Sequence, residues 1–183
     1  MHDNLKLQTE QLRMSLLDVD AWHKQIDETI RCLKQTFARQ NKVLVAGKGG
    51  SATIAQHFAD EKGGRYRTKR IPYPVIALTA DSAVLTCIGN DFGFEDIFLR
   101  QVQALGQAND VLIVFSTSGK SENLLRAVRQ ASQQEMIILG FTGSQSQIES
   151  VSHAVTVPSE DPPRIQELHL HAIHLICEAF EPE

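Results

Sequence analysis

Histidine and glutamate at helical spacing are the first feature of this sequence that could do chemistry. His57 and Glu61 lie four residues apart, so on a helix they share one face and can converge on one metal ion or one substrate atom. For two such residues alone, a surface pair without a function is the simpler explanation. The C-terminal segment RIQELHLHAIH, residues 164–174, adds three more histidines, which gives a shared site more weight.

Within that C-terminal segment, helical spacing favours one particular face. Glu167, His171 and His174 stand at positions i, i+4 and i+7, so they would point to the same side of a helix. Imidazole nitrogens and carboxylate oxygens are common ligands of transition metals. The alternative is a polar stripe that faces solvent or a protein interface.

Two loops could bind an anion. STSGKS at 116–121 holds four hydroxyl groups at the expected start of a helix, where side-chain and backbone donors can hold phosphate oxygens. One helix cap requires only one hydroxyl, so four favour anion binding over capping. GKGGSA at 47–52 fits the dinucleotide fingerprint formally, but the acidic residue expected about 20 positions later is missing. The P-loop pattern is also absent, and a sugar phosphate is the better match for the two loops.

The chain alternates between short apolar runs and helical stretches, which predicts how these loops are held. Runs rich in Val, Ile and Leu lie at 43–46, 74–78, 111–115, 136–141 and 154–157. Helical stretches are expected near 51–62, 82–88, 94–105, 121–134, 145–150 and 163–180. Such alternation predicts an α/β three-layer sandwich with a five-stranded parallel sheet. Because ligands bind at the carboxyl ends of parallel strands, loops 47–51, 81–82 and 116–121 should share one rim.

The first 40 residues differ from the rest because they show only helical periodicity. Apolar residues recur at helical spacing from Leu5 to Phe37, and we predict two helices with a break near residues 18–20. Wide apolar stripes need burial, so these helices are expected to pack against a partner subunit. A length of 183 residues suits one domain, 1–183, with its α/β core at 41–183.

Composition excludes several classes of protein. A formal net charge of −4 argues against general nucleic-acid binding, and the basic run RYRTKR at 65–70 is interpreted as a solvated turn. No apolar run approaches the ~18 residues of a membrane span, and no signal peptide is recognisable, so a cytoplasmic location is expected. Three widely spaced cysteines, Cys32, Cys87 and Cys177, are predicted to be reduced core thiols.

Five segments together resemble the phosphoheptose isomerases, a family of sugar isomerase (SIS) domain proteins. The segments run in consistent order from about residue 40 to 178: GKGGS, AQHFADEKGGRYR, GND followed by FGFEDIF, STSGKS, and RIQELH with its later histidine. The resemblance implies the SIS fold, with a flavodoxin-like, doubly wound sheet. It also implies a homotetrameric, zinc-dependent isomerase that converts sedoheptulose 7-phosphate into D-glycero-D-manno-heptose 7-phosphate, a precursor of lipopolysaccharide heptose.

The resemblance also assigns roles to individual residues. It implies that zinc is bound by His57, Glu61, Gln166 and His174, with Glu61 as the base and His174 as the acid. It places the substrate phosphate at Ser116, Thr117, Ser118 and Ser121. The remaining substrate contacts that it implies are Gly49, Gly50, Ser51, Asn90, Asp91 and Gln166.

Two features depart from the resemblance. Lys48 stands where the family usually has asparagine, which keeps open an isomerase for another ketose phosphate. Gln166 and His174 would lie about 12 Å apart along a straight helix. Either the helix begins near Gln166 or the ligands come from two chains, and the Glu167, His171 and His174 face is a rival. A different class, non-catalytic SIS regulators that bind a replication initiator protein, lacks the glutamate and the final histidine that this chain keeps.

Overall fold

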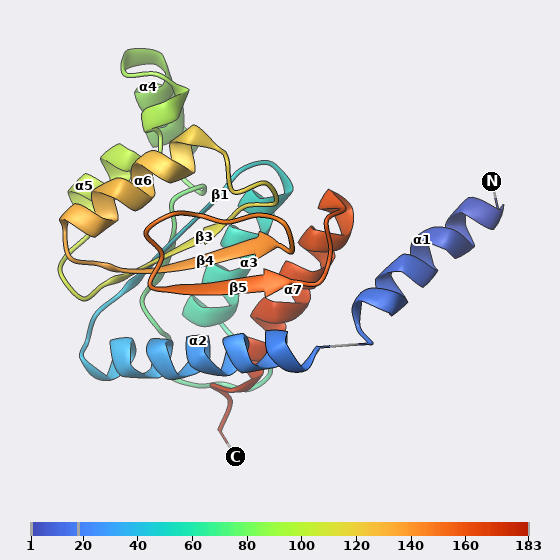
Figure 1. Ribbon diagram of the computed structural model, residues 1–183. Helices are drawn as coiled ribbons and strands as arrows, with labels where there is room; N and C mark the ends of the chain where they lie inside the picture. Colours follow the sequence, from blue (N-terminus) through green and yellow to red (C-terminus); the bar gives the residue numbers. More distant parts are fainter. Residues whose placement is uncertain (1, 18, 183) are drawn as a thin grey trace.

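The structure, a computed structural model, describes residues 2–17 and 19–182, and its centre is a five-stranded parallel sheet (Figure 1). The strands are β1 (Val43–Gly47), β2 (Val75–Ala77), β3 (Val111–Phe115), β4 (Ile137–Gly143) and β5 (His153–Val157). Every residue of β1 and β3 is buried, as expected for central strands covered on both faces. The order β2-β1-β3-β4-β5 is the flavodoxin-like order and confirms the predicted α/β class.

Helices cover both faces of this sheet and make the predicted three layers (Figure 1). On one face α7 packs between α3 and α2, and the core side chains of this layer include Leu33, Phe58 and Ile173. On the other face α4, α5 and α6 contribute Ile88, Val102 and other apolar residues. The helices are α1 (His2–Ser15), α2 (Asp20–Ala38), α3 (Gly50–Gly63), α4 (Ser82–Asp91), α5 (Leu99–Leu105), α6 (Glu122–Gln133) and α7 (Pro162–Glu178), with a 3₁₀ turn η1 (Phe94–Asp96).

Two of the predicted helices were wrong. Residues 145–150 form turns and irregular backbone instead of a helix, and Ser150 has a φ of 62°, which an α-helix does not allow. The predicted helix over 94–105 is divided into η1 and α5, because Ile97 and Phe98 between them turn into the core. In both places the backbone conformation depends on which side chains are buried, rather than on helical periodicity.

The N-terminal helix α1 extends away from the body of the molecule (Figure 1). The two predicted N-terminal helices are confirmed, and residue 18 of the predicted break lies outside the described ranges. Arg164 Nη1 donates to the carbonyl oxygen of Gln8 at 2.8 Å, so α1 touches α7. Leu5, Leu7 and Leu17 are more than half exposed. Among the described helices, none is long and apolar enough to cross a membrane.

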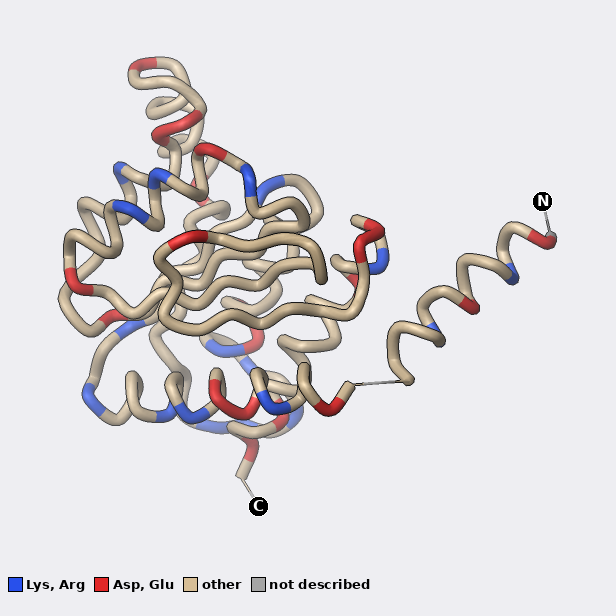
Figure 2. The backbone as a smooth tube through the Cα atoms, viewed as in Figure 1, with Lys and Arg blue, Asp and Glu red and all other residues tan. Residues whose placement is uncertain are grey.

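The basic segment at 65–70 is largely exposed, as predicted for a solvated turn, and it is also bound to residues at the C-terminal end of the chain. Arg67 Nε lies 2.6 Å from Glu178 Oε2, and the Thr68 amide donates to Glu181 Oε2 at 2.8 Å. Figure 2 shows the positions of Lys and Arg (blue) and of Asp and Glu (red) mixed along the backbone, and the sequences of the five strands contain none of these residues. The ion pair of Arg67 and Glu178 lies at the surface, and these contacts hold the loop against the C-terminal end of α7.

The three cysteines have different environments, and all are free. Cys177 is buried, and that burial raises the pKa of its thiol to about 11. Cys32 is half-buried and its pKa is raised for the same reason. Cys87 is exposed on α4, so the prediction of a core thiol was wrong for this residue.

Candidate active site

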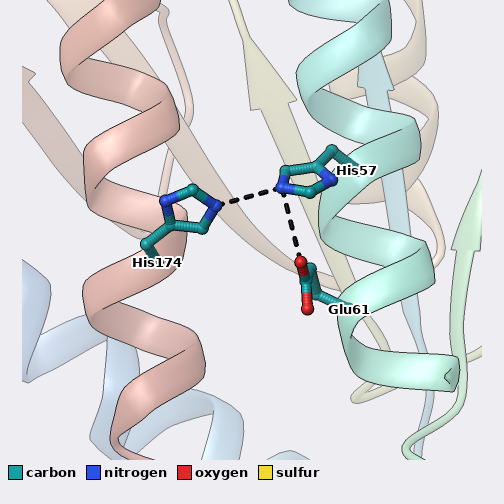
Figure 3. A group of neighbouring side chains, drawn as sticks. All are labelled: His57, Glu61 and His174. Atoms are coloured by element: carbon teal, nitrogen blue, oxygen red, sulfur yellow. Dashed lines mark hydrogen bonds and ion pairs between the residues drawn. The ribbon is translucent and has the colours of Figure 1, made fainter. Parts of the chain in front are cut away.

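Three side chains from two helices meet beside the sheet. Figure 3 shows His57 and Glu61 of α3 and His174 of α7 pointing toward one another. His57 Nε2 lies 3.0 Å from His174 Nε2 and 3.5 Å from Glu61 Oε1. One ligand atom from each residue lies within 4.8 Å of the other two. His174 follows Glu61 by 113 positions and His57 by 117, and the three side chains form one cluster because α3 and α7 pack together.

The donor set of this cluster fits a divalent metal ion. Two imidazole nitrogens and one carboxylate oxygen are ligands that zinc takes, and tetrahedral zinc would hold two nitrogens about 3.3 Å apart. Glu61 Oε2 is buried and has no hydrogen-bond partner in the described chain, so the carboxylate has unused acceptor capacity. Asp60 Oδ1 lies 3.3 Å from His57 Nδ1, which favours a proton on Nδ1 and leaves the Nε2 lone pair for a metal.

An open groove leads to this cluster from the side of the edge strand β2. Its volume is about 720 Å³, and its lining includes Gln56, His57 and Asp60 of α3 and Ile76 of β2. The His57 side chain is 35% exposed, whereas that of Glu61 is 16% exposed. A small molecule can therefore reach His57 from solvent, and the carboxylate lies deeper.

The rival face of α7 does not come together as a metal site. Glu167 pairs with Arg164 on the same helix, three residues away. The His171 ring packs on Trp22 of α2, with ring centroids 5.7 Å apart. Only His174 of that face reaches the cluster with His57. Of the four residues that the resemblance assigned to the metal, the structure brings three together, whereas the set chosen by helical spacing stays apart.

Gln166 lies apart from the other three residues that the resemblance assigned to the metal. Its side-chain amide lies so close to Gly50 that a Cβ atom there would collide with it. Because α7 begins at Pro162, Gln166 is already inside the helix, and about 12 Å of helix separates it from His174. Within one chain, the structure thus places Gln166 beside the glycine loop, away from His57.

The hydroxyl-rich loop 116–121 lies at the carboxyl end of β3, next to the glycine loop that follows β1. Gly47 pairs with Phe115 in the sheet, so the loops that begin there share one rim, as predicted. The Ser116 hydroxyl accepts a hydrogen bond from the Gly119 amide, and the Ser118 hydroxyl accepts one from Lys120. Ser121 is the N-cap residue of α6 but its side chain makes no capping bond. Its hydroxyl and the helix N-terminus are thus available to an anion.

Known proteins are similar to this chain along most of its length. Residues 9–143 match the SIS domain family. A phosphoheptose isomerase of Helicobacter pylori is 45% identical over 158 residues, which cover 85% of this chain and 82% of that protein. The chain belongs to the phosphoheptose isomerase family. A solved phosphoheptose isomerase of Francisella tularensis has a TM-score of 0.92 and 34% identity, covering 97% of this chain and 96% of that one. One from Neisseria gonorrhoeae has a TM-score of 0.89, with 32% identity and the same coverage.

The glycine loop of this family member has the backbone that a close ligand approach requires. Gly49 has a φ of +59°, and Ser51 is buried at the start of α3. Lys48, in place of the asparagine usual in the phosphoheptose isomerase family, is exposed on the same loop. An added cation therefore stands on the rim that holds the proposed phosphate loop.

Asn90 and Asp91 lie at the end of α4, which projects from the body of the molecule (Figure 1). Asn90 Nδ2 donates to Asp91 Oδ1 at 2.6 Å, and both residues are exposed. Asp81, on the shared rim, caps α4 by accepting the Val84 amide at 3.0 Å. Contacts between the α4 pair and a sugar stay a prediction from the resemblance to the family.

Arg70 supports Glu61, and sequence reasoning missed this role. Glu61 lies in the last turn of α3, where backbone carbonyls have no partner within the helix. The Arg70 guanidinium donates to the carbonyl oxygens of Glu61 and Lys62, and Glu181 holds it from the other side. Lys62 is itself fully buried, with Nζ 3.6 Å from the centroid of the Phe180 ring. The basic run that contains Arg70 was visible in the sequence, but its partners were not.

Buried His169 should make the stability of the protein depend on pH. It is fully buried against Phe115 and Phe141, and this burial lowers its pKa from 6.5 to about 4. As the pH falls through 6.5, His169 takes up a proton in the unfolded chain but not in the folded chain. The free energy of unfolding is therefore highest above pH 6.5 and should fall by roughly 3 kcal/mol as the pH drops toward 4.

The measurement is urea unfolding of wild type and His169→Leu at several pH values between 7 and 4.5. Leucine has no proton to bind, so the difference in unfolding free energy between the two proteins should change with pH across this range. Parallel pH profiles for the two proteins would show that His169 does not resist protonation.

Proposed function

We propose that this protein is an aldose–ketose isomerase that interconverts sedoheptulose 7-phosphate and D-glycero-D-manno-heptose 7-phosphate. The observation that carries the proposal is the convergence of His57, Glu61 and His174, with one carboxylate oxygen buried and free of hydrogen bonds. Family membership supports the same reaction class, since the similar Helicobacter pylori protein is a phosphoheptose isomerase. The hydroxyl-rich loop at the end of β3 supplies the phosphate site that such a substrate requires.

Proton transfers by two side chains account for the reaction. Glu61 takes a proton from C1 of the ketose while His174 donates one to the carbonyl oxygen on C2, which gives an enediol. A proton then returns to C2 as the hydroxyl on C1 loses its proton, and the aldose results. The Asp60 carboxylate lies beside Nδ1 of His57 and orients that imidazole. Arg70 binds the backbone of the helix turn that carries Glu61. When bound, a zinc ion would offset the negative charge that develops on the substrate oxygens.

The phosphate-binding residues that we propose are Ser116, Thr117, Ser118 and Ser121, with Gly49, Gly50, Ser51 and Gln166 near the sugar. Gln166 lies against Gly50 at the start of α3, which favours a role in binding substrate. Binding energy from a phosphate far from the reacting carbons positions C1 and C2 without taking part in the chemistry. Asn90 and Asp91 complete the proposed sugar contacts.

The proposal includes a homotetramer in the cytoplasm that serves the synthesis of heptose for lipopolysaccharide and binds no nucleic acid. Support for subunit contacts comes from α1, whose Leu5, Leu7 and Met14 are exposed on a helix that leaves the body of the molecule. Helices with such apolar side chains gain stability when a second surface covers them. Zinc as the metal rests on the donor set of His57, Glu61 and His174.

The decisive experiment measures the interconversion of ketose and aldose phosphates by the purified protein. Ketose phosphates of five, six and seven carbons are compared, each with zinc and with a chelator. We expect conversion of sedoheptulose 7-phosphate that the chelator abolishes. Faster conversion of a shorter substrate would reassign the specificity and make Lys48 the first residue to examine. Failure to convert any of them would contradict the enzyme and favour a binding protein.

A further inference from the structure

The loop that follows β4 packs directly on the proposed phosphate loop, although it lies outside all five segments of the family resemblance. The Ser146 hydroxyl donates to the carbonyl oxygen of Thr117 at 3.0 Å. Ser146 is held in turn, because the Thr142 hydroxyl donates to its carbonyl oxygen at 2.9 Å. A Cβ atom on Gly119 would collide with the backbone of Gln147, so the two loops touch at a second point.

The bond from Ser146 fixes the direction of one peptide group in the phosphate loop. A trans peptide is planar, so the Thr117 carbonyl and the Ser118 amide point in opposite directions. Because Ser146 holds the carbonyl on its own side, the Ser118 N–H must point away from the loop that follows β4. In the described chain this N–H donates to no protein acceptor, and Ser118 is exposed. It is thus a donor available to a ligand.

The reverse orientation of this peptide would oppose anion binding. A flipped peptide would direct the Thr117 carbonyl oxygen, which carries partial negative charge, to the side where the Ser118 N–H now points, in the loop that leads into the N-terminus of α6. That side favours a negative ligand because free N–H groups and the positive end of the helix dipole lie there. The bond from Ser146 therefore selects the orientation that attracts an anion over the one that repels it.

We propose that Ser146 is a positioning residue for the substrate phosphate, acting through the Thr117–Ser118 peptide without touching the substrate. The inference rests on the proposed function, in which residues 116–121 bind phosphate. Ser146 is half-buried and its hydroxyl makes one bond to the loop, so its effect should appear in phosphate affinity and leave the proton-transfer residues unaffected. A charge-assisted hydrogen bond lost from the phosphate corresponds to a roughly tenfold weaker interaction.

The test compares Ser146→Ala with Ser146→Thr, which keeps the hydroxyl, and with Ser144→Ala as a matched control. Ser144 is on the same loop, is exposed, and its hydroxyl makes no hydrogen bond within the described residues. The readouts are KM and kcat for sedoheptulose 7-phosphate and the inhibition constant of inorganic phosphate. For Ser146→Ala we expect KM and the inhibition constant to rise together by roughly tenfold, with kcat within about twofold of wild type. Ser146→Thr and Ser144→Ala should match wild type.

The variant Ser121→Ala distinguishes a failure of this inference from a failure of the proposed function on which it rests. If Ser121→Ala weakens inhibition by phosphate and Ser146→Ala does not, the positioning role is overturned and the phosphate site stands. A fall in kcat with unchanged KM in Ser146→Ala would also overturn it, because the change would then act on the chemistry. If neither variant changes the inhibition constant, residues 116–121 do not bind the phosphate, and the inference fails with that assignment.

Discussion

Glu61→Gln should fold normally and lose turnover by roughly 10²–10⁴-fold, the range that a general base contributes. Glutamine has nearly the same shape as glutamate, so the last turn of α3 and its contacts with Arg70 should persist. Its amide cannot accept a proton from C1, and proton abstraction would have no base. The measurement is kcat for sedoheptulose 7-phosphate, with the thermal midpoint and the metal content taken on the same samples.

Glu178→Gln is the matched control for this variant. Glu178 is a carboxylate at the end of α7 that pairs with Arg67 at the surface, so neutralising it removes a similar charge near the same helices. We expect kcat for Glu178→Gln to stay near that of wild type. If Glu61→Gln retains full metal and full turnover, Glu61 is not the base.

Removing the imidazole of His57 should empty the proposed metal site. His57 is the central member of the cluster, since its Nε2 lies 3.0 Å from His174 and 3.5 Å from Glu61. We expect His57→Ala to bind less than about a tenth of the zinc bound by wild type at equal free zinc, because one of three ligands is gone. Elemental analysis after dialysis against a weak chelator measures this, and activity should be lost in parallel.

His171→Ala decides between the two faces of α7. His171 belongs to the rival set with Glu167 and packs on Trp22 instead of approaching His57. Its loss should cost some stability at the contact between α2 and α7 but leave the zinc content unchanged. Full zinc in His57→Ala together with reduced zinc in His171→Ala would move the metal to the rival face.

The periodicity of apolar residues was sufficient to predict the sheet and most helices. Runs such as VLVA and VLIVF are apolar at every position, which is typical of strands covered on both faces, and they became β1 and β3. The same reasoning failed at 145–150, because loop residues that pack on a neighbouring loop need no periodicity. Ile148 is buried there and Ser146 bonds to Thr117, contacts that depend on a segment about 30 residues earlier.

Long-range pairing also explains why Arg70 was missed. Its basic neighbours suggested a solvated turn, because basic runs are usually solvated faces. The acidic partner, Glu181, comes 111 residues later and is adjacent only because α7 returns along α3. Charge pairs of this kind become visible only when the chain is folded.

The spacing of His57 and Glu61 was enough to place both on one face of a helix, and the sequence alone determined that pair. Spacing alone could not determine the third member, because on the last helix it pointed to Glu167, His171 and His174, and only the family resemblance joined His174 to the pair. The apolar residues of α7, among them Leu168, Ala172 and Ile176, face the core, and this sets the rotation of the helix. That rotation turns His174 toward α3 and His171 toward α2. Helical spacing shows which side chains of α7 share a face, but only tertiary packing determines which neighbouring helix that face contacts. Tertiary packing therefore determined the cluster.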